Sequence, residues 1–129
     1  MEKNDKKARL TKILLIDDEA SFCDLVKMNL EISGRFKVVT SREGRAGIKM
    51  ARETLPDIIL LDIMMPGMDG FQLLEILRKD PKVALIPVII VSASSQDAVR
   101  AKARRMGCRY IAKPVNTEDL ISKIEDVLK

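Results

Sequence analysis

The sequence predicts an α/β protein built on a doubly wound parallel sheet of five strands, with helices on both faces. Three observations support this fold class. Short apolar runs rich in β-branched residues are continuous rather than alternating, as expected of strands covered on both faces. Helical patterns alternate strictly with these runs, which indicates (βα)5 connectivity with right-handed crossovers. The chain has 129 residues, a length that suits the sheet order 2-1-3-4-5.

The first two pairs of strand and helix occupy the N-terminal part of the chain. A strand is expected over 13–16, and the helix expected over 20–32 ends near a glycine. A second strand, over 36–40, fits the sheet edge, and Ser41 is a candidate cap for a helix that runs to Arg52. One face of the first helix is apolar and comprises Phe22, Leu25, Val26 and Leu30.

The next strands determine where a site should lie. Four aliphatic residues over 58–61 predict the third strand, and Asp69 is placed to cap a helix that ends at Lys79. The fourth strand is expected over 86–91, although a proline interrupts it. Ligands of doubly wound sheets bind beyond the carboxyl ends of the strands. The residues that follow each strand are therefore the site candidates.

The C-terminal part completes the alternation. Ser95 is a candidate cap for a helix that runs to Met106 and stops at the next glycine. A weaker strand is expected over 108–112, and Asn116 is a candidate cap for the final helix, which has acidic residues in its first turn. The apolar face of this last helix comprises Leu120, Ile121, Ile124, Val127 and Leu128.

Length and composition predict one domain with an aliphatic core. Residues 1–10 are expected to form a basic tail and residues 11–129 the domain. Hydrophobic residues make up 47% of the chain and aromatic residues 3%, and the net charge is +4. A solvated tail is favoured over one that binds nucleic acid. The scarcity of aromatic side chains also argues against a nucleic acid partner, because single strands bind by stacking.

The cysteines and the apolar runs bear on metal binding and location. Cys23 and Cys108 form no CxxC pair and the chain contains no histidine, which argues against a zinc site. They are expected to be buried in a reducing compartment. No apolar run approaches the roughly 18 to 20 residues of a membrane span, and no signal core follows the N-terminus. We therefore expect a cytoplasmic protein without a membrane partner.

Polar residues follow four of the expected strands at one edge of the sheet. Asp17 and Asp18 follow the first strand, Asp62 follows the central third strand, Ser92 the fourth and Lys113 the fifth. Neighbouring strands lie about 4.8 Å apart, so Asp17, Asp18 and Ser92 should flank Asp62. Lys113 has a long stem with which to reach across. One pocket is expected to hold all five side chains.

The residue types in this pocket indicate phosphoryl chemistry. Three crowded carboxylates repel one another, and a hard divalent cation relieves that repulsion. Oxygen ligands without histidine or cysteine favour Mg²⁺, or Mn²⁺. A lysine opposite the metal would neutralise a phosphoryl group. Asp62 is central and is the candidate nucleophile, which would form an acyl phosphate, while Ser92 could donate a hydrogen bond to a phosphoryl oxygen.

Four segments in this order and spacing resemble the receiver domain of two-component response regulators. The segments are LLIDDEA, PDIILLDIMMPGMDG, VIIVSA and YIAKP, and the resemblance extends from about Lys12 to the end of the chain. It implies a flavodoxin-like fold and a stand-alone receiver domain similar to chemotaxis regulators. It also implies phosphorelay signal transduction, in which the domain catalyses only its own phosphorylation and dephosphorylation.

The resemblance further implies a role for each site residue. Asp62 is the implied phosphoacceptor, Asp18 the direct Mg²⁺ ligand, and Asp17 a ligand acting largely through water. The backbone carbonyl of Met64 is an implied metal ligand. Lys113 is implied to bind the phosphoryl group, and its bond to the following proline is usually cis in the family. The implied switch residues are Ser92, Ala93 and Tyr110.

The sequence departs from the commonest pattern of the family at two positions. Met64 occupies a position where a polar residue is frequent, and Ser94 one where acidic residues are common. Both positions border the path of the hydrolytic water, so the sequence does not predict a dephosphorylation rate. Ser92 replaces the commoner threonine but keeps the hydroxyl. Ordinary half-buried packing is an alternative role for Tyr110.

The expected function is a switch controlled by phosphorylation. The chain has no histidine and no GxxxxGK[ST] loop, so the donor must be a histidine kinase or a phosphotransfer protein. A phosphatase of the haloacid dehalogenase type would need an aspartate where Met64 stands. An alternative remains a protein-binding module with the receiver fold that acts without phosphorylation.

Output is expected to occur by docking to another protein, because the chain leaves no space for an output domain, unless it is a fragment of a longer protein. The family commonly uses the last two helices for partners, and the first of these, expected over 95–106, is basic. We therefore expect the activated form to prefer an acidic surface. The sequence does not distinguish a monomer from a dimer induced by phosphorylation.

Overall fold

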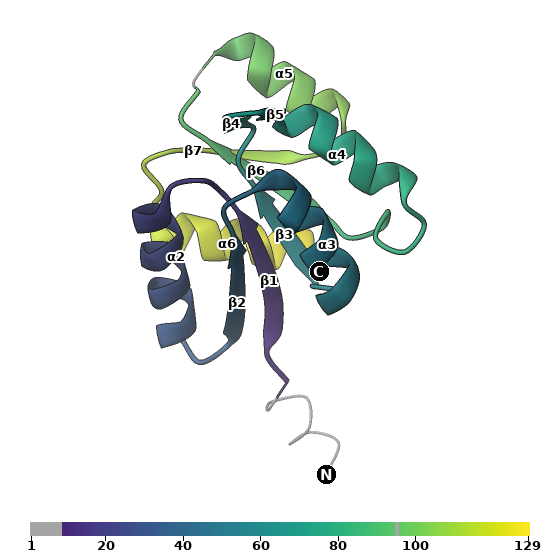
Figure 1. The fold of residues 1–129 in the computed structure, drawn as a ribbon. Coiled ribbons are helices and arrows are strands. Elements are labelled where there is room, and N and C mark those ends of the chain that lie inside the picture. The colour runs from purple at the N-terminus through teal and green to yellow at the C-terminus, as the bar shows by residue number, and fades with distance from the viewer. Residues whose placement is uncertain (1–8, 95) are drawn as a thin grey trace.

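A computed structural model describes residues 9–94 and 96–129 of the chain. Five parallel strands lie side by side in the order β2-β1-β3-β6-β7 (Figure 1), which confirms the predicted order 2-1-3-4-5 of the sheet strands. Most of the predicted basic tail, residues 1–8, lies outside the described residues. The sheet strands are β1 (Thr11–Ile16), β2 (Phe36–Ser41), β3 (Ile58–Leu61), β6 (Val88–Ser92) and β7 (Arg109–Ala112).

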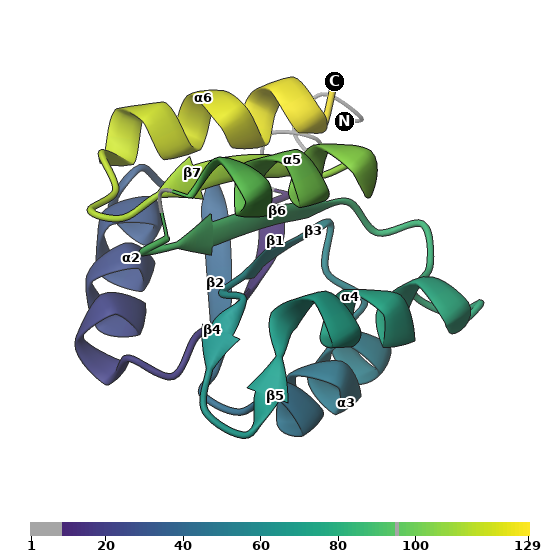
Figure 2. The same ribbon diagram turned by 90° about the horizontal axis from the view of Figure 1, so that it is seen from above.

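Helices cover both faces of the sheet, as Figure 2 shows from above. Helices α2 and α6 pack on one face, and α3, α4 and α5 pack on the other. This arrangement confirms the doubly wound α/β fold. The helices are α2 (Ala20–Ile32), α3 (Gly44–Thr54), α4 (Gly70–Lys79), α5 (Asp97–Arg105) and α6 (Thr117–Val127). No helix within the described ranges is both long and apolar enough to cross a membrane.

Two hydrophobic cores hold the sheet between the helices. Along β1, Ile13 and Leu15 contribute to the core beneath α2 and α6, whereas Leu14 and Ile16 contribute to the core beneath the other three helices. All four side chains have zero exposure. This alternation is the expected period of a strand, with both faces buried. The burial fixes the ends of the central strands, where the polar residues lie.

A short hairpin that the sequence pattern did not predict follows the third strand. Strands β4 (Met64–Met65) and β5 (Met68–Asp69) pair antiparallel. The Asp69 carboxylate then accepts a hydrogen bond of 2.9 Å from the Phe71 N–H, which confirms Asp69 as the cap of α4. Gly70 allows the close approach of this cap to the segment that follows β3, because a Cβ there would lie 2.2 Å from the Ile63 Cα.

The predicted cap of α3 is wrong. Helix α3 begins at Gly44 and its N-cap residue is Glu43, which makes no side-chain capping hydrogen bond. Ser41 instead remains in β2, where it pairs with Ile16 of β1. Its hydroxyl donates a hydrogen bond of 2.9 Å to the Glu43 carbonyl. The serine therefore orders the turn between strand and helix, because sheet pairing extends one residue further than the apolar run.

Two residues predicted on apolar helix faces are exposed. The buried face of α2 comprises Cys23, Val26 and Leu30, and Leu25 lies outside it with 52% exposure. Leu128 follows the last turn of α6 and is 37% exposed. The periodicity identified both helices correctly, but the centre of each buried face depends on where the neighbouring element packs.

The remaining caps differ in outcome. The Asn116 side chain accepts a hydrogen bond of 3.1 Å from the Asp119 N–H, which confirms the predicted cap of α6. The predicted cap Ser95 lies outside the described residues, and α5 begins at Asp97. Gly107 has a φ of 75°, the left-handed conformation typical of a glycine after a helix end.

Both cysteines are buried and free, as predicted. The Cys23 thiol donates a hydrogen bond of 3.3 Å to the Asp17 carbonyl. Burial raises the pKa of Cys23 to about 11, so the thiol is protonated at neutral pH. Burial also raises the pKa of Cys108. Neither residue has the lowered pKa of a reactive thiol.

Candidate functional site

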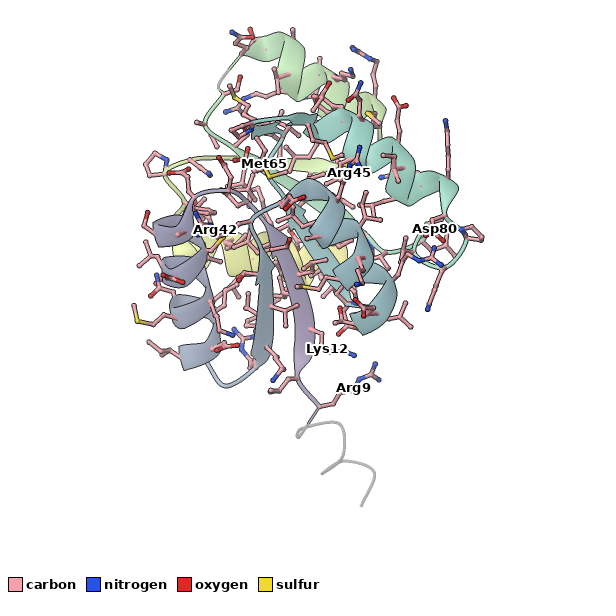
Figure 3. The ribbon with its side chains drawn as sticks, viewed as in Figure 1. Arg9, Lys12, Arg42, Arg45, Met65 and Asp80 are labelled. Carbon is pink, nitrogen blue, oxygen red and sulfur yellow. The ribbon has the colours of Figure 1, made fainter. Side chains whose placement is uncertain are left out.

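Three carboxylates converge at the carboxyl edge of the sheet. Asp17 and Asp18 follow β1, and Asp62 follows β3. Each offers an oxygen that lies within 4.8 Å of the others. The exposure of Asp17 is 0% and that of Asp62 is 4%, whereas Asp18 is half-buried. Arg42, labelled in Figure 3, donates from Nε to the Asp18 carbonyl oxygen at 3.3 Å and braces this loop.

The sheet itself positions the two buried carboxylates. The Asp17 N–H donates a hydrogen bond of 2.9 Å to the Ser41 carbonyl of β2. The Asp62 N–H donates one of 2.9 Å to the Ile16 carbonyl of β1. Both residues are therefore tied to a neighbouring strand at the end of its ladder. Their side chains leave the sheet at a fixed point rather than from a loose loop.

Hydrogen bonds from the following loops orient one oxygen of each buried carboxylate. Asp17 Oδ1 accepts from the Glu19 N–H at 2.9 Å, and Asp62 Oδ1 accepts from the Met64 N–H at 2.9 Å. The second oxygen of each residue faces the Lys113 ammonium. This division is suited to holding an ionised group in a buried position, because the backbone donors satisfy part of its demand.

Lys113 enters the cluster from the far side, after β7. Its Nζ lies 2.8 Å from Asp17 Oδ2, 2.6 Å from Glu19 Oε1 and 3.5 Å from Asp62 Oδ2. Burial alone would lower the pKa of Lys113, but its contacts with Asp17 and Glu19 and the charge of Asp62 raise the pKa above its ordinary value. Lys113 is therefore a permanent cation among the carboxylates. The Lys113–Pro114 peptide bond is cis, as the family resemblance led us to expect.

The acidic cluster is suited to binding a divalent cation, because the protein itself neutralises only part of its negative charge. Asp17 Oδ2 is buried and accepts no well-directed hydrogen bond. Burial raises the pKa of Asp17, and the Lys113 ammonium offsets only part of that effect. A buried carboxylate oxygen that has an ion pair but no hydrogen bond, beside two further carboxylates, belongs to a donor set that a hard cation satisfies. The acidic triad therefore has the composition of a metal site.

The predicted switch residues lie beside this cluster. Ser92 ends β6 and is fully buried, and its Oγ accepts a hydrogen bond of 3.4 Å from the Ser94 N–H. Ala93 follows directly and is exposed. Tyr110 of β7 is half-buried, and its hydroxyl donates to the Ser94 carbonyl. The structure thus connects Ser92 and Tyr110 through a single backbone residue.

The backbone and the side chain of Met64 have different surroundings. Its backbone N–H contacts Asp62, as described above, but its side chain is 60% exposed. The thioether is therefore exposed to solvent rather than packed in the core.

Sequence reasoning assigned no role to two residues that contact Lys113. Glu19 pairs with Nζ, and the Phe22 ring centroid lies 4.3 Å from the same Nζ. An ammonium over an aromatic face gains a cation–π interaction. The sequence offered one indication of the contact between Phe22 and Lys113. Phe22 lies in the first turn of α2, one helical turn after Asp18, which precedes the helix. Its apolar character placed it correctly on the helix face that packs against the core, but did not indicate this contact.

Fold and site together define a doubly wound domain with an acidic, phosphoacceptor type of pocket at the carboxyl edge of its sheet. The chain belongs to the response regulator receiver domain family, because the family model described as "Response regulator receiver domain" matches residues 13–125. Receiver domains are phosphoacceptor modules of two-component signalling rather than conventional enzymes. Membership implies a kinase as phosphodonor and a downstream partner.

Individual proteins show the same similarity. The chain is 38% identical over 120 residues to protein PilH of Pseudomonas aeruginosa, covering 92% of this chain and 98% of PilH. It is 34% identical over 121 residues to the DNA-binding dual master transcriptional regulator RpaA of Synechocystis, covering 93% of this chain but 50% of RpaA. The structure of chemotaxis protein CheY4 of Vibrio cholerae matches with a TM-score of 0.85 and 26% identity, covering 93% of this chain and 100% of that one.

Proposed function

We propose that Asp62 accepts a phosphoryl group from a histidine kinase or a phosphotransfer protein and that the modified domain then controls a protein partner. One observation carries the proposal. Asp62 is 4% exposed, has carboxylate neighbours within 4.8 Å and has the Lys113 ammonium 3.5 Å from Oδ2. A buried acid with both a candidate cation site and a fixed lysine beside it is suited to receiving a phosphate.

The proposed transfer forms one bond and breaks one. An oxygen of Asp62 attacks the phosphorus of a phosphohistidine, so an O–P bond forms and the N–P bond breaks. The leaving imidazole nitrogen keeps the electron pair of that bond. Lys113 can then contact a phosphoryl oxygen, because its ammonium already lies within reach of Asp62. Its permanent charge, argued above from its raised pKa, favours the doubly negative product.

The proposed metal is Mg²⁺, with Mn²⁺ as a substitute. Asp17, Asp18, Asp62 and the backbone carbonyl of Met64 would hold it. When bound, the metal supplies positive charge that neutralises the carboxylates and the transferred phosphoryl oxygens. The buried Asp17 Oδ2, which accepts no hydrogen bond, supports this assignment, as does a donor set made only of oxygen atoms.

The proposed switch passes through Ser92, Ala93 and Tyr110. A hydrogen bond from the Ser92 hydroxyl to a phosphoryl oxygen would draw the end of β6 toward Asp62. Ser94 would move with it, and Tyr110 would lose or change its acceptor, because its hydroxyl donates to the Ser94 carbonyl. The surface made by α5, β7 and α6 would change accordingly.

The downstream protein is proposed to dock on that surface. Whether the phosphorylated domain acts as a monomer or as a dimer is a question for measurement of mass in solution. A cytoplasmic location is proposed from membership of the receiver family.

The direct experiment uses acetyl phosphate as a small phosphodonor. We expect a mass increase of one phosphate in the presence of Mg²⁺, lability of that phosphate to base, and no increase after chelation of the metal. Asp62→Asn should abolish the increase. Asp57→Asn is a matched control, because Asp57 lies at the opposite edge of the sheet and hydrogen-bonds Lys12. An unchanged mass for the folded wild-type protein would favour the binding module that acts without phosphorylation.

A further inference from the structure

The strand β2 lies at one edge of the sheet. Among the described residues it pairs only with β1, and Figure 1 shows it beside α2. At the end of this pairing the Asp17 N–H donates to the Ser41 carbonyl of β2. Successive residues of a strand direct their backbone groups to alternate sides, so the groups of Phe36, Val38 and Thr40 point away from the sheet. Such an edge can accept a strand of another chain.

Two side chains of α2 occupy the middle of this edge. The Lys27 ammonium donates to the Val38 carbonyl at 2.6 Å, and the Glu31 carboxylate accepts from the Val38 N–H at 2.9 Å. Lys27 and Glu31 lie one helical turn apart, and their charged groups are 3.1 Å from each other. Both backbone groups of the central outward residue are therefore satisfied within the chain by the Lys27–Glu31 pair.

The contact with Val38 distinguishes this pair from an ordinary ion pair on a helix surface. The side chains of Lys27 and Glu31 are 45% and 36% exposed, so their mutual attraction contributes little to stability. Their contacts with Val38 are specific in geometry, because one side chain meets the donor and the other meets the acceptor. The main consequence of the pair is thus that these two backbone groups are unavailable to another strand.

The sequence of β2 is well suited to pairing with a second copy of itself. The strand reads FKVVTS, in which three residues are β-branched, one is charged and none is proline or glycine. In an antiparallel pairing centred on Val38, Phe36 of one copy would lie opposite Thr40 of the other. Lys37 would lie opposite Val39, so no like charges would face each other. The two copies of Val38 would exchange two hydrogen bonds through the groups that α2 occupies.

We propose that the Lys27–Glu31 pair blocks antiparallel pairing of β2 with the β2 strand of a second copy of this chain. While the pair covers Val38, an incoming strand meets free backbone groups only at Phe36 and Thr40, on either side of the blocked position. The second copy is the partner because the centred pairing is self-complementary and requires no other segment. Natural proteins commonly protect edge strands with charged side chains, and here an adjacent helix supplies them. The inference is independent of the proposed function.

The test removes both contacts and measures self-association of the unphosphorylated protein by sedimentation velocity over a range of concentrations. Lys27→Ala combined with Glu31→Ala keeps good helix formers in α2. This double variant should self-associate at least about tenfold more tightly than the wild type, because each pair of copies gains two backbone hydrogen bonds. Glu75→Ala combined with Lys79→Ala is the matched control. Both residues are exposed, one turn apart on α4, and should leave association unchanged.

Amide hydrogen exchange shows whether association uses this edge. In the double variant, exchange at the Thr40 N–H should slow as the concentration rises, because the second strand would accept a hydrogen bond from it. In the wild type, the Val38 N–H should exchange more slowly than the Thr40 N–H at every concentration. The wild-type comparison needs no substitution, so it decides the matter even if circular dichroism shows that the double variant does not fold.

Four results would overturn the proposal. The first is a folded double variant that associates no more tightly than the wild type. The second is equal association of the α4 control, which would show a general effect of exposed charge. The third is association without slower exchange at Thr40, which would place the contact elsewhere. The fourth is a wild-type Val38 N–H that exchanges as fast as that of Thr40. Tighter association of the double variant alone, with slower exchange at Thr40, supports the proposal.

Discussion

The two edges of the sheet hold the same kinds of charged residue in opposite surroundings. At the amino edge, Asp57 Oδ2 accepts from the Lys12 N–H at 2.8 Å, and the Lys12 ammonium donates to the Thr54 carbonyl at 3.2 Å. Arg9, labelled with Lys12 in Figure 3, lies 4.0 Å from Asp57 and is 80% exposed. At the carboxyl edge, Asp17 and Asp62 are buried, the Lys113 side chain is 11% exposed, and one Asp17 oxygen lacks a hydrogen bond.

The charges at the amino edge stabilise the fold slightly, whereas the buried charges at the carboxyl edge destabilise it and are held in place by the rest of the structure. Exposed, satisfied pairs at the amino edge cost little and contribute little, typically below about 1 kcal/mol. Buried like charges at the carboxyl edge lose hydration and repel one another. The two apolar cores supply the stability that permits this arrangement. A cluster that costs free energy in the isolated domain indicates a ligand that recovers it.

The largest effect is expected from removing the central cation. Lys113→Met should lower the free energy of unfolding by about 3 kcal/mol in metal-free buffer, because it leaves buried carboxylates without their partner. Lys12→Met, the matched change at the amino edge, should cost roughly 0.5 kcal/mol. Urea denaturation followed by circular dichroism measures both. Adding Asp17→Asn to Lys113→Met should recover part of the loss, and equal losses at the two edges would remove the contrast.

The second prediction concerns whether removing a carboxylate raises or lowers the free energy of unfolding. Asp17→Asn should raise the metal-free unfolding free energy by about 1 kcal/mol, since it removes a buried charge that repels its neighbours. Asp57→Asn should lower it by about 1 kcal/mol, because Asp57 accepts the Lys12 backbone N–H. Titration with Mg²⁺ should then stabilise the wild type but not Asp17→Asn. A destabilised Asp17→Asn in metal-free buffer would show that the buried carboxylate supports the fold.

The smallest effect is a pH dependence away from the acidic cluster. The Glu31 side chain accepts from the Val38 N–H at 2.9 Å, and this bond, followed by the Lys27 ion pair, lowers the pKa of Glu31. A lowered folded-state pKa contributes stability above the unfolded pKa, which is lost as pH falls through the folded value. Glu31→Gln should remove this contribution, less than about 1 kcal/mol after solvent screening.

Denaturation midpoints between pH 7 and about pH 3 measure this contribution across the ordinary glutamate range. The gap between wild type and Glu31→Gln should be largest at neutral pH and should close toward the acidic end. Glu53→Gln, an exposed carboxyl of α3, is the control and should shift little. A difference between the midpoints of wild type and Glu31→Gln that widens as the pH falls would contradict the lowered pKa of Glu31.

The sequence predicted the sheet and most of the acidic pocket for the same physical reason. Continuous apolar runs mark strands with both faces buried, and the polar residue that ends such a run must lie at an edge. Asp17, Asp62 and Ser92 all follow this logic, and the structure brings the three carboxylates of the predicted set together with Lys113. The individual roles of these residues stay predictions until they are tested.

Other features had no such signal in the chain. The hairpin of β4 and β5 has two residues in each strand, too few for a period to appear. Glu19 and Phe22 both contact Lys113, and more than ninety positions separate Glu19 from Lys113 in the sequence. These contacts depend on how α2 and β7 approach each other in space.

The most direct test of the central claim is to identify the residue that carries the phosphate. Borohydride reduces an acyl phosphate to an alcohol, which converts a phosphorylated aspartate to homoserine. After treatment with acetyl phosphate and Mg²⁺ followed by borohydride, tandem mass spectrometry of the digested protein should locate homoserine at position 62. Homoserine at position 17 or 18 would contradict the assignment of Asp62, and its absence from the entire chain would contradict phosphorylation as the function.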